Sequence, residues 1–135
     1  MRKEIAKKWV KALRSGKYKQ GQCYLKQFYD NGKTEHCCLG VLCELYNDEM
    51  KKNHKKMLST KIRNKISGTD CVTFNNQEGE LPKVVMKWAD INDPIGRYVV
   101  ETKHGEEISS LADMNDIGKT FKTISNFIEK NVENI

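Results

Sequence analysis

The chain has 135 residues, of which 31% are charged and 38% hydrophobic, and its formal net charge is +6. These values fit one soluble domain with its own core, and no apolar run reaches the roughly 18 residues of a transmembrane helix. Five unevenly spaced cysteines do not fit a disulfide framework, and the charged N-terminal segment lacks the apolar stretch of a secretory signal, so we expect a cytoplasmic protein.

Apolar periodicity and turn residues divide the chain into helices and short strands. In chain order they predict a helix over 3–14, a hairpin over 22–37, a helix over 38–50, a short helix within 58–66, a strand over 71–74, a helix after Pro82, a hairpin over 97–110 and a last helix from Phe121 to Ile135. The predicted fold class is α+β, with three to four helices packed around short antiparallel strands in a single domain, 1–135.

Positive charge is concentrated in residues 51–66, which hold seven Lys or Arg and no acid. The rest of the chain has 17 basic and 18 acidic residues and is close to neutral. We therefore expect residues 51–70 to form a basic insertion, either a solvated face or a mobile loop. Such a segment can also bind a partner that carries phosphate.

The stretch HCCLGVLCEL, residues 36–45, holds three of the five cysteines and raises the question of a metal or redox site. Cys37 and Cys38 are adjacent, which rarely lets both sulfurs bind one ion, and Cys38 and Cys43 would point about 140° apart on a helix. No CxxC pair occurs, and no histidine is placed to activate a thiol. We expect no catalytic residue, no metal and no cofactor, and we expect these cysteines to be small buried hydrophobes. Gly40 predicts a close backbone contact.

Residues 13–21, LRSGKYKQG, combine the side-chain types that hold a nucleotide. Cations bind phosphate, an aromatic ring stacks on a base and an amide bonds to a base edge. The alternative is a helix end followed by a basic strand entry. The candidate ligand-binding residues of this segment are Arg14, Ser15, Lys17, Tyr18 and Gln20.

The sequence DMNDIGKTF, residues 113–121, resembles the end of a P-loop, but Asp113 stands where that motif requires glycine. We therefore expect Gly118 to form a turn and Lys119 or Thr120 to begin the last helix. Helix N-termini attract phosphate, which makes Lys119 and Thr120 candidates for contact with an anionic ligand. Trp88 is a candidate for stacking on a base, with core packing as the alternative.

Four segments together resemble a widespread family of small bacteriophage proteins. They are WVxALRSGxYxQG from Trp9, CCLGVLCEL from Cys37, Leu81-Pro82 before the helix that carries Trp88, and LAxMNDxGKTF from Leu111. The resemblance covers nearly the whole chain apart from the basic window.

This family is similar to the phage anti-CBASS sponges, which bind cyclic dinucleotide signals such as cyclic GMP–AMP and sequester them without cleavage. The resemblance implies a non-enzymatic, phage-encoded homo-oligomer in the host cytoplasm, a tetramer being one arrangement. The site residues come from the chemistry above. The alternative function is a module that binds protein or nucleic acid through residues 51–66. We do not expect a membrane partner, nor, because the rest of the chain is nearly neutral, a nucleic-acid partner.

Overall fold

The computed structural model describes residues 1–64 and 70–135 and confirms the predicted α+β class in a single domain. Five helices replace the expected three to four: α1 Lys3–Arg14, α2 Cys38–Lys52, α3 Lys83–Ala89, α4 Leu111–Asp116 and α5 Phe121–Lys130. The strands are β1 Lys26–Phe28, β2 Thr34–His36, β3 Thr60–Asn64, β4 Asp70–Phe74, β5 Arg97–Thr102 and β6 Gly105–Ser110.

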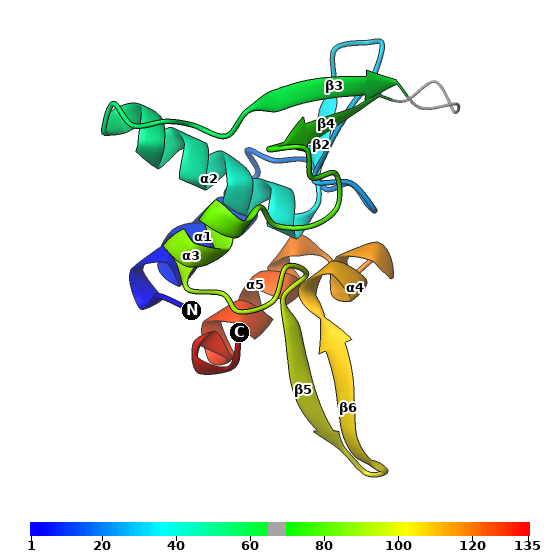
Figure 1. Ribbon diagram of the computed structural model, residues 1–135. Helices are drawn as coiled ribbons and strands as arrows, with labels where there is room; N and C mark the ends of the chain where they lie inside the picture. The colour runs from blue at the N-terminus through cyan, green and yellow to red at the C-terminus, as the bar shows by residue number, and fades with distance from the viewer. Residues whose placement is uncertain (65–69) are drawn as a thin grey trace.

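The strands form two separate antiparallel sheets. One has the order β2-β1-β4-β3, and the other is the β5–β6 hairpin. Figure 1 places the four-stranded sheet and α2 at one end of the molecule and the hairpin at the other. Within the described residues, no helix has the length and apolarity needed to cross a membrane.

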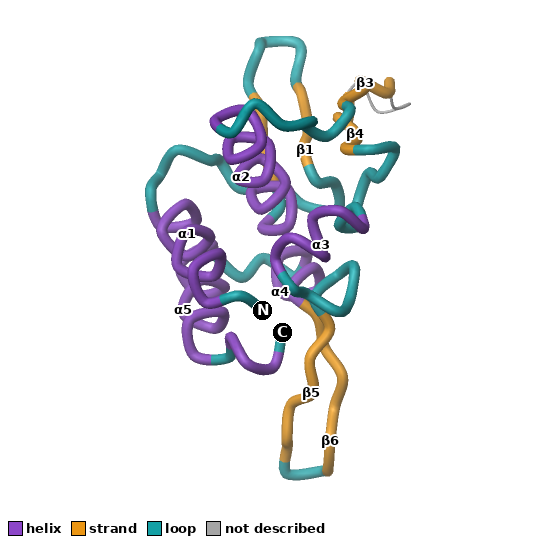
Figure 2. The backbone as a smooth tube through the Cα atoms, turned by 60° about the vertical axis from the view of Figure 1, so that its left-hand side comes forward, coloured by secondary structure: helices purple, strands orange, loops and turns teal. Residues whose placement is uncertain are grey.

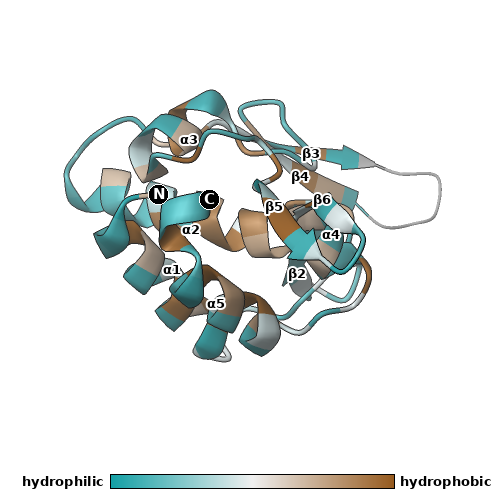
Figure 3. Ribbon diagram, turned by 90° about the horizontal axis from the view of Figure 1, so that it is seen from below, coloured by the Kyte–Doolittle hydropathy of each residue, from teal (hydrophilic) through white to brown (hydrophobic). Residues whose placement is uncertain are grey.

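The core lies between the helices. Figure 2 shows α1 and α5 side by side, and Figure 3 shows brown, hydrophobic segments and teal, hydrophilic segments along both helices. Both helices bury hydrophobic residues in this core. Trp9 is fully buried, and its Nε1 donates a hydrogen bond of 2.9 Å to the carbonyl oxygen of Cys38. The single polar atom of this large side chain is thus satisfied, which lets α1 pack on the start of α2 without a buried, unpaired donor.

The cysteine-rich stretch forms the buried first turns of α2, as predicted. Cys37, Cys38 and Cys43 are buried, and no disulfide joins them. A Cβ added at Gly40 would overlap the carbonyl oxygen of Leu25 and lie 2.6 Å from its carbonyl carbon. The expected close backbone contact is therefore confirmed, and it joins α2 to the residue that precedes β1.

The predicted helix within 58–66 is wrong, because residues 60–64 form strand β3. β3 pairs with β4, and Ile62 lies opposite Val72. Leu58 is buried but Ile62 is 61% exposed, so their four-residue spacing does not make one apolar face. Residues 65–69 of the predicted insertion, including Ile66, lie outside the described residues.

Two other predicted boundaries differ from the structure. The strand expected within 22–29 covers only residues 26–28, because Cys23 has a φ of 67° and breaks the extended chain. The last helix ends at Lys130, and a short 3-10 turn, Val132–Asn134, follows it.

The six-residue helix α4 was not predicted as a helix, since it is too short for apolar periodicity to show.

Replacing Gly40 by alanine tests the contact with Leu25. Because the neighbour is backbone and cannot rotate away, Gly40→Ala should lower the free energy of unfolding by at least about 3 kcal/mol, measured by urea denaturation. Gly32→Ala is the control: the added methyl meets open space but the φ is +81°, so the expected cost is only about 1 kcal/mol. Equal losses in the two variants would contradict the close contact.

Candidate functional site

A polar cleft of about 600 Å³ lies beside the loop that precedes β1 and is called here the amide cleft. Its side chains come from Gln20, Gln22, Tyr24, Gln27, Tyr29 and Glu35, and Gly21, Cys23 and Gly118 complete its lining. Amides and phenols can each donate and accept hydrogen bonds, and phenol rings also offer flat apolar faces. The cleft therefore suits a flat, polar ligand better than an aliphatic one.

Asn115 fixes the floor of the amide cleft. This side chain is fully buried, and its Nδ2 donates to the carbonyl oxygen of Gly21 at 2.8 Å. Its Oδ1 accepts from Nε2 of Gln20 at 3.0 Å and from the backbone N–H of Cys38 at 3.2 Å. One amide thus joins α4, the loop before β1 and the start of α2.

Gln20 and the turn around Lys119, which belong to two predicted ligand segments, contact each other in the structure. The Nε2 of Gln20 donates to the carbonyl oxygen of Lys119 at 2.8 Å, and its Oε1 accepts from the N–H of Phe121 at 2.9 Å. Gly118 turns the chain with a φ of +87°, and the hydroxyl of Thr120 caps α5 by accepting from the N–H of Thr123. The expected turn and N-cap are confirmed.

The loop of residues 21–23 is tightly constrained. The N–H of Cys23 donates to Oδ1 of Asp116 at 2.9 Å, and Nε2 of Gln22 donates to the carbonyl oxygen of Asp116 at 3.1 Å. A Cβ on Gly21 would lie 2.8 Å from the Cβ of Glu35. Glycine at this position therefore lets the loop approach the β1–β2 hairpin closely enough to form one wall of the cleft.

The wall opposite this loop carries Glu35, a carboxylate that is paired with a lysine and a phenol. The hydroxyl of Tyr29 donates to Oε2 of Glu35 at 2.9 Å, and this hydrogen bond is the main cause of the raised pKa of Tyr29. Nζ of Lys19 lies 3.4 Å from Oε1 of Glu35. Because Lys19 balances Glu35, an anionic ligand would not face an unpaired negative charge here.

Arg14 and Ser15 serve the helices. The guanidinium of Arg14 donates to Oγ of Ser125 at 3.0 Å, to Oδ1 of Asn126 at 2.7 Å and to Oε2 of Glu129 at 2.8 Å. Oγ of Ser15 donates to a carbonyl oxygen of the last turn of α1 at 2.6 Å. A ligand phosphate at Arg14 would have to replace these bonds between α1 and α5.

Lys17 and Tyr18 lie beside a buried histidine. Nζ of Lys17 is 5.1 Å from the centre of the Tyr18 ring, within the range of a cation–π contact. Tyr18 in turn packs edge-on against His36 at a centroid distance of 5.2 Å. Burial is the main cause of the raised pKa of Tyr18. Both Lys17 and His36 therefore contact the ring of Tyr18, which leaves less of it for stacking on a base.

Trp88 belongs to a different cluster, on α3. Its Nε1 donates to Oε1 of Glu49 at 3.0 Å, and its ring packs edge-on against Tyr46 at 5.5 Å. Glu49 also pairs with Lys8 of α1 at 2.8 Å. These contacts join α3 to α1 and α2, and Trp88 does not line the amide cleft.

Burial governs the chemistry of the cysteine-rich stretch. It raises the pKa of Cys37 to about 12 and raises the pKa values of Cys38 and Cys43 as well. Thiols in this state are poor nucleophiles. Across residues 1–64 and 70–135, no three His, Cys, Asp or Glu side chains gather as a metal site would require. Cys23 is the exposed cysteine and borders the amide cleft.

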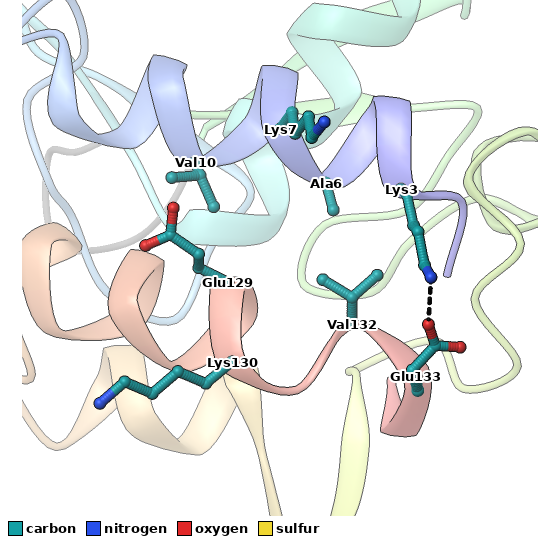
Figure 4. Close-up of a pocket in the computed structure, with 8 residues that line it drawn as sticks. All are labelled: Lys3, Ala6, Lys7, Val10, Glu129, Lys130, Val132 and Glu133. Carbon is teal, nitrogen blue, oxygen red and sulfur yellow. Dashed lines mark ion pairs between the residues drawn. The ribbon is translucent and has the colours of Figure 1, made fainter.

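A smaller groove of about 300 Å³ runs between α1 and the C-terminal end of α5. Figure 4 shows Ala6, Val10 and Val132 around this groove, with Lys3 and Glu133 paired at 2.7 Å on its rim. No amide or aromatic side chain lines it. Its polar side chains are three lysines and two glutamates, so it offers charges but, unlike the amide cleft, no amide for a base edge and no ring for stacking.

Sequence reasoning missed most of the amide cleft, and a signal for part of it exists. Gln27 lies in β1 and Tyr29 directly follows this strand, two positions along the chain, and Gln27 pairs with Glu35 across the β1–β2 hairpin. Side chains at alternate positions share a sheet face, so the predicted hairpin could have placed these three together.

Glu44 was also missed. This side chain is largely buried, and its Oε1 lies 2.8 Å from Nζ of Lys26 and 2.9 Å from Nε2 of His36.

Replacing Asn115 tests its role in fixing the cleft. Asn115→Ala leaves the carbonyl oxygen of Gly21 and the N–H of Cys38 without this partner and removes one of the two bonds of Nε2 of Gln20, so the free energy of unfolding should fall by about 3 kcal/mol. Asn92→Ala, at an exposed position, is the control and should change it by less than about 0.5 kcal/mol. Chemical denaturation measures both, and equal stabilities would contradict the network.

Glu44 should make stability depend on pH in the acid range. Burial acts to raise the pKa of Glu44, but the hydrogen bonds from His36 and Lys26 prevail and lower it from 4.5 to about 2. A depressed pKa stabilises the fold above pH 4.5, and this contribution is lost as the pH falls towards 2. After allowance for solvent screening, denaturation series should show about 2 kcal/mol of such loss in the wild type and little of it in Glu44→Gln. Parallel pH curves would contradict this assignment.

Comparison with known proteins gives one family. Neither curated proteins nor solved structures give a match. The profile of a domain of unknown function, DUF8296, matches residues 1–132. Nearly the whole chain, with α1, α2, the amide cleft and α5, falls within this match. The chain therefore belongs to the DUF8296 family.

Proposed function

We propose that this protein is a phage-encoded, non-enzymatic sponge that binds and sequesters cyclic oligonucleotide immune signals, such as cyclic GMP–AMP, and so blocks the CBASS defence of the host. The amide cleft is the proposed binding site. The observation that carries this proposal is a polar cleft of about 600 Å³ bordered by both predicted ligand segments, through Gln20 and Gly118.

The chemistry of the cleft supports recognition of a nucleotide base. Gln22 is exposed and Gln27 is half-buried, and both line the cleft. Their amides match the donor and acceptor pattern of a base edge, and the rings of Tyr24 and Tyr29 offer stacking faces. Lys19 precedes Gln20 and Lys119 follows Gly118, two residues that line the cleft, and in this proposal both lysines supply positive charge for phosphate, with Lys19 shared with Glu35.

The proposal also includes assembly of the protein from several copies in the host cytoplasm. A 15.6 kDa chain with an open cleft encloses little of a dinucleotide by itself. A second copy that covers the cleft would bury more of the ligand and hold the site in its binding conformation before the ligand arrives. Arg14, Lys17 and Trp88 contribute to binding in this proposal only if the ligand reaches beyond the cleft.

A titration with cyclic di- and trinucleotides tests the function. Calorimetry should give saturable binding, and ligand recovered after denaturation should be chemically unchanged. Gln22→Ala should weaken binding about tenfold, the effect of one lost hydrogen bond in a desolvated site. The matched control is Gln77→Ala, an exposed glutamine outside the cleft, which should bind like the wild type.

Labelling of Cys23 gives an independent readout of the same experiment. In the native protein, Cys23 should react promptly with a thiol reagent while the four buried cysteines react only after denaturation. A bound nucleotide should protect Cys23, because this residue borders the cleft. Absence of heat, of a melting shift and of protection with every cyclic nucleotide would refute the proposal, and cleaved ligand would refute its non-enzymatic part.

A further inference from the structure

The β5–β6 hairpin projects from the body of the protein and carries an exposed apolar pair (Figures 1 and 2). Val99 is 58% exposed and Ile108 is 74% exposed, and the two residues lie directly opposite each other in the strand register. A two-stranded hairpin is marginally stable in water by itself. An apolar pair held in water on such a projection indicates a surface for a partner.

The next pair on the same face indicates the charge of that partner. Glu101 lies opposite Glu106, and both side chains are exposed. Within the described residues, neither carboxylate forms an ion pair with a cation of the same chain. Like charges directly opposite each other destabilise a strand pair. A partner with an apolar centre and flanking cations would cover the valine and isoleucine and relieve this repulsion.

The chain carries such a surface at its other end. β3 is the outer strand of the four-stranded sheet, and among the described strands only β4 pairs with it. Ile62 is 61% exposed and lies between exposed Lys61 and Arg63, of which Arg63 also pairs with Glu78 at 3.0 Å, so Lys61 is the main cation for a partner. The free edge of β3 also offers unpaired backbone groups, which bind an added strand readily. Its apolar centre and positive flanks complement the hairpin.

We propose that the β5–β6 hairpin of one copy docks on the β3 edge of a second copy. Val99 and Ile108 then cover Ile62. The carboxylates of Glu101 and Glu106 face the positive charge of Lys61. The two surfaces lie at opposite ends of the molecule in Figure 1, so this contact joins unlike patches. Contacts of this kind close into rings or continue as filaments. The interface is independent of any nucleotide and remains testable if the proposed function fails.

Sedimentation velocity over a wide concentration range tests the interface in the full chain without added ligand. The wild type should self-associate, and salt should weaken the association because exposed charges are screened. Reversal of the hairpin charges, Glu101→Lys with Glu106→Lys, and reversal of the edge charge, Lys61→Glu, should each raise the dissociation constant at least about tenfold. Lys122→Glu, a reversal at an exposed position of α5, is the control and should leave it unchanged.

Mixing the two charge-reversed proteins distinguishes a lost contact from a misfolded hairpin. Each variant keeps one surface of native charge, so an equimolar mixture restores opposite charges at every contact and should recover association. A wild type that stays monomeric would overturn the proposal. An oligomer that both reversals leave intact would also overturn it, as would variants whose mixture stays monomeric. A monomer that binds duplex DNA through Lys61 would assign the β3 edge to a different partner and would overturn it too.

Discussion

The buried amide of Asn115 is the constraint on which the rest of this structure depends. Besides its bonds to Gly21, Gln20 and Cys38, its Nδ2 lies 3.2 Å from a carboxylate oxygen of Asp116. An amide has two donors and two acceptor positions, and here they join segments far apart in the sequence. Because the side chain is fully buried, water cannot replace these bonds. The loop that forms one wall of the cleft is therefore held to the core of the domain.

The polar side chains of the candidate site differ in how many of their hydrogen bonds are already made within the protein. Arg14 and Gln20 have the residue types that bind nucleotides, yet both bond to backbone or side chains of α4, α5 and the turn between them. Gln22 and Gln27 line the cleft, although Nε2 of Gln22 also donates to the carbonyl oxygen of Asp116. A site built this way loses little conformational entropy when a ligand binds, because its walls are already ordered.

Local patterns predicted those parts of the fold whose partners are close in sequence. The helices at 3–14 and 38–50 and both hairpins were recovered, because apolar repeats and tight turns are local signals. β3 was not recovered although its partner β4 is close in sequence, because the four-residue spacing of Leu58 and Ile62 imitates the apolar face of a helix. The cleft was recovered only at its border, since its walls meet through contacts between distant segments.

The projecting hairpin also has a consequence for how the molecule moves. Its root is fixed, since Tyr98 packs on Phe127 at 4.3 Å and its hydroxyl bonds to Ser109. Beyond that root, the side chains of both strands are exposed and add almost nothing to the core. Segments with so few buried contacts open in local equilibria of their own, at a lower free energy than global unfolding. The tip of the hairpin is therefore a separate unit of local stability, whose opening leaves the helical core intact.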